Sequence, residues 1–341
     1  MNETAPRSFL VVRLGALGDI VHTVPAVAAL RETFPGARIG WVVERKWSSL
    51  VKMASCVDEV ICLEPSAAGY LSCIRRLRSG QYDCVIDFQG LYKSALLARF
   101  SGAARRVGRD RASAREPGAA QFYSDYVHPA GRHVAEMNVS LAVGAGARQP
   151  DAMRFPMLVP QKASKQVKAI LDKAGIYEFI VVSPGGGWRS KCWPADRYGA
   201  VCADVWGRHG LPAVINIGPG EESLAREVVE AAAPAQSLVL SLPLPQLGAL
   251  LMQSKLVISA DSGPLHLAAA LGARTVGLFG PTDPARNGPL PTGLVLCNGV
   301  ADGSIAKTGA YERGESYSSS MLSLSVEQVC EAVERELVSA L

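Results

Sequence analysis

Short apolar runs rich in Val and Ile alternate with longer amphipathic segments along the first half of this chain. A short apolar run bounded by turn residues is typical of a buried strand, and apolar residues three or four apart are typical of a helix. The pattern predicts helices between strands at Phe9–Arg13, Ile39–Val43, Glu59–Leu63 and Cys84–Phe88. Because strands that alternate with helices form parallel sheets, this half is expected to be an α/β domain.

The alternation weakens twice and then restarts. It weakens from about Ala103 to Arg132, where Arg and Gly accumulate, and again over Gly144–Pro160, which we interpret as a linker. Beyond the linker the pattern predicts a helix near Lys162–Ala174 and strands at Phe179–Ser183, Ala213–Ile217, Leu256–Ser259 and Thr275–Phe279. We therefore expect an N-terminal domain over residues 1–155, a second doubly wound domain over 156–324, and an amphipathic helix over 325–341 that could pack back on the N-terminal domain.

The composition is that of a well-packed α/β enzyme. With 341 residues, 48% of them hydrophobic and 19% charged, the chain is neither disordered nor fibrous and can bury two cores. No basic start followed by an apolar run opens the sequence, and no stretch stays apolar for the roughly 20 residues of a membrane span, so a cytoplasmic protein is expected. The eight cysteines form no C-x-x-C pair and the five histidines are scattered, so no protein-bound metal is expected.

The charge is unevenly distributed. The net charge is +4, but residues 1–150 hold 19 Lys and Arg against 13 Asp and Glu, whereas the remainder holds 16 against 18. A basic N-terminal half indicates an anionic partner such as phosphates, carboxylates or an acidic membrane surface, and we expect no nucleic acid. The alternative is ordinary surface charge.

The first candidate site is the segment LGALGDIVHTVP at Leu14–Pro25, which follows the first expected strand. Gly15 and Gly18 indicate a turn at a helix N-terminus, where backbone N–H groups can approach a ligand. Their spacing does not fit the G-x-G-x-x-G fingerprint, which argues against a nicotinamide-dependent oxidoreductase, although Glu44 after the second strand keeps that alternative open. Asp19 is either a helix cap or, at the carboxyl end of a strand, a base that accepts a proton from a substrate hydroxyl.

The second candidate site is the glycine-rich segment Ser183–Pro194. Three glycines, Gly185–Gly187, precede the cations Arg189 and Lys191. Backbone N–H groups together with Lys191 suit a diphosphate. The alternative is a flexible loop with solvated charges, but three successive glycines are conformationally costly unless something requires close backbone approach.

The third candidate site again lies where an expected strand meets a helix. The segment DSGPLH at Asp261–His266 places an acid, a hydroxyl and a glycine N–H at a helix start, which suits an anion. The alternative is a plain helix cap with a half-buried histidine. The segment GPTDP at Gly280–Pro284 follows the next strand, so several strand ends with polar residues are expected at one edge.

Taken together, these segments resemble the lipopolysaccharide heptosyltransferases of glycosyltransferase family 9. The resemblance rests on DSGxxH followed by GPTDP, on LGALGDIVHTVPA, on DFQGLYKS at Asp87–Ser94 and on AREP at Ala114–Pro117. It covers nearly the whole chain and is greatest to the heptosyltransferase I members. It implies the GT-B fold, in which two Rossmann-like, doubly wound parallel-sheet domains face a cleft, with the acceptor on the N-terminal domain and the nucleotide sugar on the C-terminal one.

The resemblance also implies roles for individual residues. Asp19 would be the general base, and Glu221 or Glu222 would hold the adenosine ribose. The donor site would comprise Gly186, Gly187, Lys191, Glu221, Glu222, Asp261, Ser262, Gly263, His266 and Thr282. One departure from the family is the stretch Gly185–Gly187, where heptosyltransferase I members often carry hydroxyl residues, so backbone N–H groups would have to contact the phosphates.

On the acceptor side the resemblance implies a cationic rim suited to an acidic sugar. The rim would comprise Lys93, Arg109, Arg111, Arg115 and His133, and the acceptor site would also include Gly18, His22 and Gln89. Arg binds carboxylate or phosphate with two parallel hydrogen bonds, which favours this role. The alternative for the run Arg105–Arg115 is a solvated loop, and solvated charge is our preferred interpretation of Arg75, Arg76 and Arg78.

The implied reaction is the metal-independent, inverting transfer of L-glycero-D-manno-heptose from ADP-heptose to the Kdo of lipid A. No cofactor is implied. We expect a monomer, with peripheral contact to the cytoplasmic face of the inner membrane. The alternatives are heptosyltransferase II or another family 9 enzyme with a different donor or acceptor, and a non-catalytic sugar-nucleotide-binding protein, against which the presence of Asp19 argues.

Overall fold

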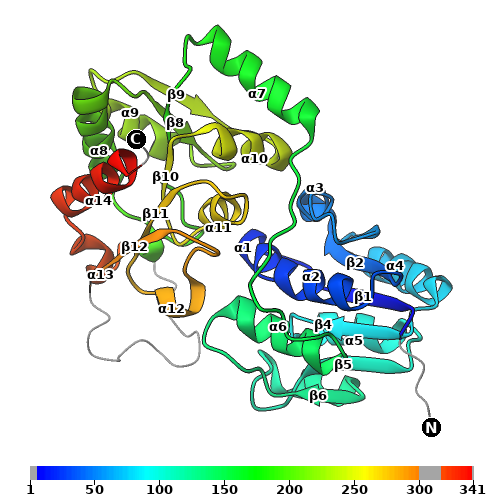
Figure 1. Cartoon of the computed structure of the whole chain (residues 1–341). Coiled ribbons are helices and arrows are strands. Elements are labelled where there is room, and N and C mark those ends of the chain that lie inside the picture. Colours follow the sequence, from blue (N-terminus) through cyan, green and yellow to red (C-terminus); the bar gives the residue numbers. More distant parts are fainter. Residues whose placement is uncertain (1–5, 299–315, 340–341) are drawn as a thin grey trace. The chain divides into compact units, whose positions relative to one another are not determined.

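The computed structural model describes residues 6–298 and 316–339, and the chain divides into two compact units after Leu158 (Figure 1). The division falls in the irregular segment between α6 (Val134–Gly144) and α7 (Gln161–Lys173). The sequence placed the boundary after residue 155, in the same segment.

The first unit is built on a six-stranded parallel sheet. Its strands are β1 (Ser8–Val12), β2 (Arg38–Glu44), β3 (Glu59–Leu63), β4 (Cys84–Asp87), β5 (Arg105–Arg109) and β6 (Asp125–Val127). They lie in the order β3-β2-β1-β4-β5-β6, which is the doubly wound order of dinucleotide-binding folds. The chain therefore reverses its direction of progress between β1 and β4, and ligands bind at such switch points.

Helices cover both faces of this sheet. They are α1 (Leu17–Val21), α2 (Val24–Thr33), α3 (Ser48–Val51), α4 (Ala67–Gly80), α5 (Tyr92–Phe100), α6 and the 3-10 turns η1 (Arg45–Trp47) and η2 (Pro117–Phe122). Leu10 packs in one core with Leu77 of α4 and Leu97 of α5, whereas the adjacent Phe9 meets Phe34, at the end of α2, with ring centroids 5.1 Å apart. Burial on both faces explains why β1 is apolar at nearly every position.

The second unit repeats this architecture. Its strands are β7 (Ile180–Ser183), β8 (Ala213–Asn216), β9 (Ser237–Leu240), β10 (Leu256–Ala260), β11 (Thr275–Phe279) and β12 (Leu294–Cys297). They form a parallel sheet in the order β12-β11-β10-β7-β8-β9, so the switch point lies between β7 and β10. The expected fold class, two doubly wound parallel-sheet domains, is confirmed.

The helices of the second unit include the one expected at the C-terminus. They are η3 (Arg189–Lys191), α8 (Ala195–His209), α9 (Glu222–Ala232), α10 (Leu244–Gln253), α11 (Gly263–Ala270), α12 (Pro284–Asn287), α13 (Ser319–Leu322) and α14 (Val326–Val338), together with α7. Val329, Val333 and Leu337 of α14 are buried in the core that also contains α8 and α9. The helix that we considered could pack back on the N-terminal domain therefore buries its apolar side within the second unit.

The strands that the sequence predicted occur within one or two residues of their expected bounds, but β5, β6, β9 and β12 were missed. β5 begins with two arginines and has the sequence RRVGR, so it lacks the apolar run by which the other strands were recognised. Arg105 lies 3.1 Å from the carboxylate of Asp125 in β6 and donates to the carbonyl oxygens of Gly144 and Ala145 at 2.8 and 3.0 Å. The solvated loop considered for Arg105–Arg115 is thus wrong for its first five residues, which form a strand.

Two further sequence features can be placed in the fold. Six of the cysteines are buried and two, Cys62 and Cys297, are half-buried, and all eight are free thiols. In the part of the chain that the structure describes, no helix is both long and apolar enough to cross a bilayer.

Candidate functional site

The carboxyl ends of β1, β4, β5 and β6 carry all the residues expected on the acceptor side. These four strands are neighbours in a parallel sheet, so their carboxyl ends lie along one edge. Gly18, Asp19 and His22 follow β1, Gln89 and Lys93 follow β4, Arg109 ends β5, Arg111 and Arg115 follow it, and His133 follows β6. The topology therefore brings these residues to the same side of the first unit.

Asp19 is held in place by a buried arginine. Its Oδ2 lies 2.5 Å from a terminal nitrogen of Arg13 and accepts the N–H of Ala16 at 3.3 Å. The side chain of Arg13 is 8% exposed, and its other terminal nitrogen donates to the carbonyl oxygen of Phe88 at 2.8 Å. Asp19 itself is 36% exposed, and no hydrogen bond joins its Oδ1 to another described residue. The carboxylate is thus fixed through one oxygen and presents the other.

Sequence reasoning missed Arg13. Its signal was a cation at the end of an otherwise apolar run, a place where a buried charge needs a partner. Asp19, six residues further on, is that partner.

Gln89 and Asp87 brace the switch point of the first unit from within. The amide oxygen of Gln89 accepts the N–H of Leu14 at 2.8 Å, which ties the ends of β1 and β4 together. Asp87 is fully buried and accepts the Tyr123 hydroxyl at 2.7 Å and the Gln89 N–H at 2.8 Å. Burial raises the pKa of Asp87 above its ordinary value, although these hydrogen bonds oppose the rise. Because the amide oxygen of Gln89 is used by Leu14, only its amide nitrogen is left to contact an acceptor, the role expected for Gln89 from the sequence.

The cations of the expected rim differ in their surroundings. Lys93 lies 3.5 Å from a carboxylate oxygen of Glu44, and Arg109 lies 3.5 Å from Oδ1 of Asn138. Arg111 and Arg115 are exposed. The loop that carries Arg115 rests against the end of β4, because the N–H of the next residue donates to the carbonyl oxygen of Gly90 at 3.0 Å.

His22 and His133 lie in the interior. Their rings meet edge to face with centroids 5.1 Å apart, and both side chains are buried. Nδ1 of His133 accepts the N–H of Ala135 at 3.1 Å at the start of α6, so this ring caps a helix. The structure gives both rings a packing role and exposes little of either to an acceptor.

The donor residues expected from the sequence lie at the carboxyl edge of the second sheet. Gly186, Gly187 and Lys191 follow β7, Glu221 and Glu222 follow β8, Asp261, Ser262, Gly263 and His266 follow β10, and Thr282 follows β11. The strands β11, β10, β7 and β8 are consecutive neighbours in the sheet, so this edge also collects the expected site.

Asp261 is the centre of a buried charge cluster at the switch point between β7 and β10. Its two oxygens lie 2.7 Å from Nζ of Lys191 and 3.0 Å from Nε2 of His266. Burial acts to raise the pKa of Asp261, but the hydrogen bond from His266 and the charge of Lys191 outweigh it and hold the pKa well below the ordinary value. The cluster therefore contains an ionised carboxylate that fixes a lysine ammonium where a diphosphate is expected.

The start of α11 provides donors beside this cluster. Ser262 is the N-cap in an extended conformation, and its hydroxyl lies 2.7 Å from that of Ser259. The helix begins at Gly263, so its first N–H groups point out of the sheet edge. The hydroxyl of Thr282 is buried and has no hydrogen-bond partner among the described residues. A group with acceptor oxygens would satisfy these donors.

The glycine loop after β7 packs against Glu221. A Cβ on Gly185 would lie 2.1 Å from Oε1 of Glu221, and Gly187 has φ +72°, a conformation that favours glycine. Oε2 of Glu221 accepts the N–H of Gly218 at 2.7 Å. Glu221 thus braces two loops, whereas the neighbouring Glu222 is exposed and makes no hydrogen bond or ion pair with another described residue. Glu222 thus has both carboxylate oxygens available, whereas Glu221 uses Oε2 for Gly218 and places Oε1 against Gly185.

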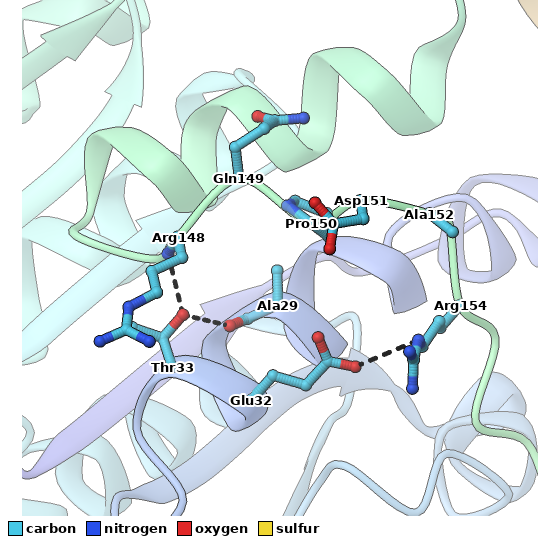
Figure 2. Close-up of a pocket in the computed structure, with 9 residues that line it drawn as sticks. All are labelled: Ala29, Glu32, Thr33, Arg148, Gln149, Pro150, Asp151, Ala152 and Arg154. Carbon is cyan, nitrogen blue, oxygen red and sulfur yellow. Dashed lines mark hydrogen bonds and ion pairs between the residues drawn. The ribbon is translucent and has the colours of Figure 1, made fainter.

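A cavity of about 210 Å³ in the first unit lies away from these residues (Figure 2). It lies at the end of α2, where the segment from Arg148 to Arg154 crosses the helix. This end of α2 is toward the amino edge of the sheet, opposite the carboxyl edge that carries Asp19. Its lining holds two acids, Glu32 and Asp151, and two arginines, Arg148 and Arg154, of which Arg154 lies 3.6 Å from Glu32. We assign it no ligand.

Within the described residues, no group of three or more His, Cys, Asp and Glu side chains is arranged to hold a metal ion. Lys191 places a side-chain cation at the carboxyl edge of the second sheet.

The fold, two doubly wound parallel-sheet units, is that of a glycosyltransferase of the GT-B type. A solved glycosyl transferase family 9 structure from Veillonella parvula superposes with a TM-score of 0.83 at 24% identity and covers 98% of this chain and 97% of its own, which supports the fold. The E. coli heptosyltransferase WaaC with ADP gives a TM-score of 0.77 at 26% identity, over 96% of this chain and 99% of that one.

This chain belongs to glycosyltransferase family 9, the heptosyltransferases, because the family described as "Glycosyltransferase family 9 (heptosyltransferase)" matches residues 70–307. Lipopolysaccharide heptosyltransferase 1 of Pseudomonas aeruginosa is 30% identical over 82% of this chain and 80% of its own length. These relationships confirm the resemblance seen in the sequence, make the chain a glycosyltransferase, and support heptosyltransferase activity in lipopolysaccharide core biosynthesis.

Proposed function

We propose that this enzyme transfers L-glycero-D-manno-heptose from ADP-heptose to a Kdo residue of lipid A, with inversion and without a metal ion. The observation that carries the proposal is the carboxylate of Asp19, fixed by Arg13 at the carboxyl end of β1 in a chain similar to lipopolysaccharide heptosyltransferase 1. The proposal includes a monomeric enzyme that acts at the cytoplasmic face of the inner membrane.

In this proposal the second unit holds the donor. The E. coli relative was solved with ADP, and the edge of β7, β8, β10 and β11 offers matching chemistry. Lys191 and the first N–H groups of α11 bind the diphosphate, and the Thr282 hydroxyl donates to one of its oxygens. Glu222 binds the ribose hydroxyls with two available oxygens, and Glu221 holds the glycine loop and the N–H of Gly218.

The first unit holds the acceptor and its base. Oδ1 of Asp19 takes the proton from an acceptor hydroxyl, whose oxygen forms a bond to the anomeric carbon of the heptose. The bond from that carbon to the diphosphate breaks on the opposite face, and ADP leaves with the electron pair. Lys191 and the α11 N-terminus stabilise the negative charge that develops, which is work a metal ion does in other transferases. Arg109 and Arg115 bind the acceptor's carboxylates or phosphates.

The test is ADP release from ADP-heptose with Kdo-bearing lipid A, measured with and without EDTA. We expect release that requires the acceptor and persists in EDTA, and an inverted anomeric configuration in the product. Donor binding without acceptor-dependent release would overturn the proposed acceptor. Loss of turnover in EDTA that Mg²⁺ restores would overturn metal independence.

A further inference from the structure

The outer sides of α4 and α5 expose apolar side chains at helical spacing. On α5, Leu96 and Phe100 are 37% and 41% exposed and lie four residues apart, so they share one side of the helix. Leu71 on α4 is 51% exposed. The opposite sides of both helices are buried, as Leu77 and Leu97 in the core of the first unit show. Exposed apolar residues on two adjacent helices require an explanation that single scattered ones do not.

The same surface is cationic. Neither α4 nor α5 contains an Asp or Glu, and their cations are Arg75, Arg76, Arg78, Lys93 and Arg99. Arg75 and Arg78 follow Leu71 at spacings that keep them on its side of α4, and Arg99 stands beside Leu96 and Phe100.

Part of this charge is neutralised within the protein and part is not. Arg76 lies 2.9 Å from Glu59, and Lys93 lies 3.5 Å from Glu44. The side chains of Arg75 and Arg99 are exposed and form no hydrogen bond or ion pair with another described residue. These two are the cations most available to an external anion.

The two helices form one continuous surface. They pack side by side over the same face of the sheet, and Nε of Arg78 on α4 donates to the carbonyl oxygen of Phe100 on α5 at 3.1 Å. We call this surface the α4/α5 face and define it by Leu71, Arg75, Arg78, Leu96, Arg99 and Phe100.

We propose that the α4/α5 face docks this enzyme on an anionic lipid bilayer. Cations complement the negative headgroups, and apolar side chains between them enter the boundary of the acyl region, as in amphipathic surface helices. A bilayer is favoured over a protein partner, because neither helix carries a carboxylate, and a face with charge of one sign suits a surface of uniformly negative headgroups.

The position of the face fits a lipid-linked substrate, and in this respect the inference rests on the proposed function. Helix α5 begins just after the carboxyl end of β4, so it starts at the edge that carries Gln89 and Lys93. An acceptor saccharide anchored in the same bilayer would therefore reach this edge without leaving the membrane surface.

The test compares sedimentation of the full-length enzyme with vesicles of phosphatidylethanolamine and phosphatidylglycerol and with vesicles of phosphatidylcholine alone. We expect salt-sensitive binding to the anionic vesicles only. The variant Arg75→Glu/Arg99→Glu should bind at least about 30-fold more weakly, because each lost cation near an anionic surface costs roughly a factor of five and each new carboxylate adds repulsion. Leu71→Glu/Leu96→Glu should bind more weakly as well.

Matched controls lie on the second unit. Lys162→Glu/Lys165→Glu on α7 makes the same charge change, and Met252→Glu on α10 alters a side chain that is 53% exposed. Both should bind vesicles like the wild type. Thermal unfolding of every variant establishes that the fold is retained.

Turnover separates this inference from the proposed function. With a delipidated, water-soluble Kdo acceptor the face variants should match the wild type, whereas with acceptor embedded in anionic vesicles they should be slower. If neither acceptor gave turnover, the proposed function would be wrong, but the vesicle-binding result would still test the docking inference by itself. The inference would be overturned if the wild type did not bind anionic vesicles, or if the face variants bound them as tightly as the wild type. A dimer in solution that Leu71→Glu/Leu96→Glu dissociates would also overturn it.

Discussion

At the scale of the residue, two carboxylates are held by cations in different ways that suit different tasks. Asp261 is enclosed, with Lys191 and His266 on its two oxygens, so both oxygens already have partners within the protein. Asp19 is half-exposed, with Arg13 on one oxygen only, so its other oxygen can meet a substrate. The sequence predicted both acids but could not distinguish these environments, because the partners are distant along the chain or, like Arg13, concealed in an apolar run.

Replacing the proposed base should abolish chemistry and spare binding. Asp19→Asn keeps the shape of the side chain but cannot accept a proton, so kcat should fall about 100- to 10,000-fold. The affinity for ADP, measured by calorimetry, should stay at the wild-type value because the donor residues belong to the second unit. A variant with wild-type kcat would remove Asp19 from the mechanism.

Arg13 should act as a positioning residue for that base. Arg13→Met removes the contact to Asp19 and the hydrogen bond to Phe88, and a misplaced base can cost about 100-fold in kcat. Steady-state kinetics should show this loss with little change in donor KM. Arg13→Lys retains the charge but not the two-pronged geometry, so its kcat should lie between those of the wild type and Arg13→Met. Equal losses in kcat and in thermal stability for both variants would indicate a merely structural arginine.

The stability contributed by Asp261 should depend on pH in a defined direction. Its pKa is lowered in the folded protein, so its contribution is complete above the ordinary value of 3.8 and is lost as the pH falls below it. Relative to the wild type, Asp261→Asn should destabilise the second unit by about 3 kcal/mol near neutral pH, because Lys191 is left without its carboxylate. Urea unfolding, followed by hydrogen exchange in peptides of that unit, should show the difference shrinking in acid. A difference that is constant or grows in acid contradicts the assignment.

At the scale of the element, the sequence predicted the strands with an apolar interior and missed β5, which opens with charge, and three of the four edge strands, β6, β9 and β12. β3 and β11 have the expected bounds, whereas β5 opens with two arginines whose roles depend on β6 and α6. Periodicity reports burial, and an arginine that is satisfied by distant carbonyl oxygens looks the same in sequence as one in solvent. For the same reason, the bracing roles of Gln89 and Glu221 could not be predicted.

Arg105 and Arg111 form a matched pair that tests this distinction. Arg105→Ala removes the contacts that join β5 to Asp125 and to the end of α6, and should destabilise the first unit by about 2 kcal/mol. Arg111→Ala removes an exposed side chain and should change stability by less than about 0.5 kcal/mol. Urea unfolding measures the loss of unfolding free energy in each variant. Equal losses would show that Arg105 contributes no more than a solvated side chain.

At the scale of the whole molecule, the two units share one strand order and collect different chemistry at corresponding positions. Each gathers its polar residues at the carboxyl edge, around the switch point between its first and fourth strands. The rule that open α/β sheets bind ligands there allowed the sequence to indicate both candidate sites before any side chain was placed. The sequence could not show which cations are paired with carboxylates of the protein itself, as Lys93 is with Glu44.

ADP should protect the donor edge in a way that depends on Asp261. At about 100 times its Kd, ADP should stabilise the conformations that bind it by about 2.7 kcal/mol. Hydrogen exchange should therefore slow at the carboxyl ends of β7, β8, β10 and β11. In Asp261→Asn this protection should be lost at the same ADP concentration. Protection confined to the first unit would show that the donor site lies elsewhere.

The bond between Gln89 and Leu14 has a consequence for redesign. It fastens the turn that carries the proposed base to the neighbouring strand β4. The loop between β5 and η2 that presents Arg111 and Arg115 meets the end of the same strand through the Glu116 N–H, which donates to the carbonyl oxygen of Gly90. An engineer who grafts a foreign loop to change the sugar that is recognised should therefore replace residues 110–115 and keep Glu116, so that the strand end that holds the base is undisturbed.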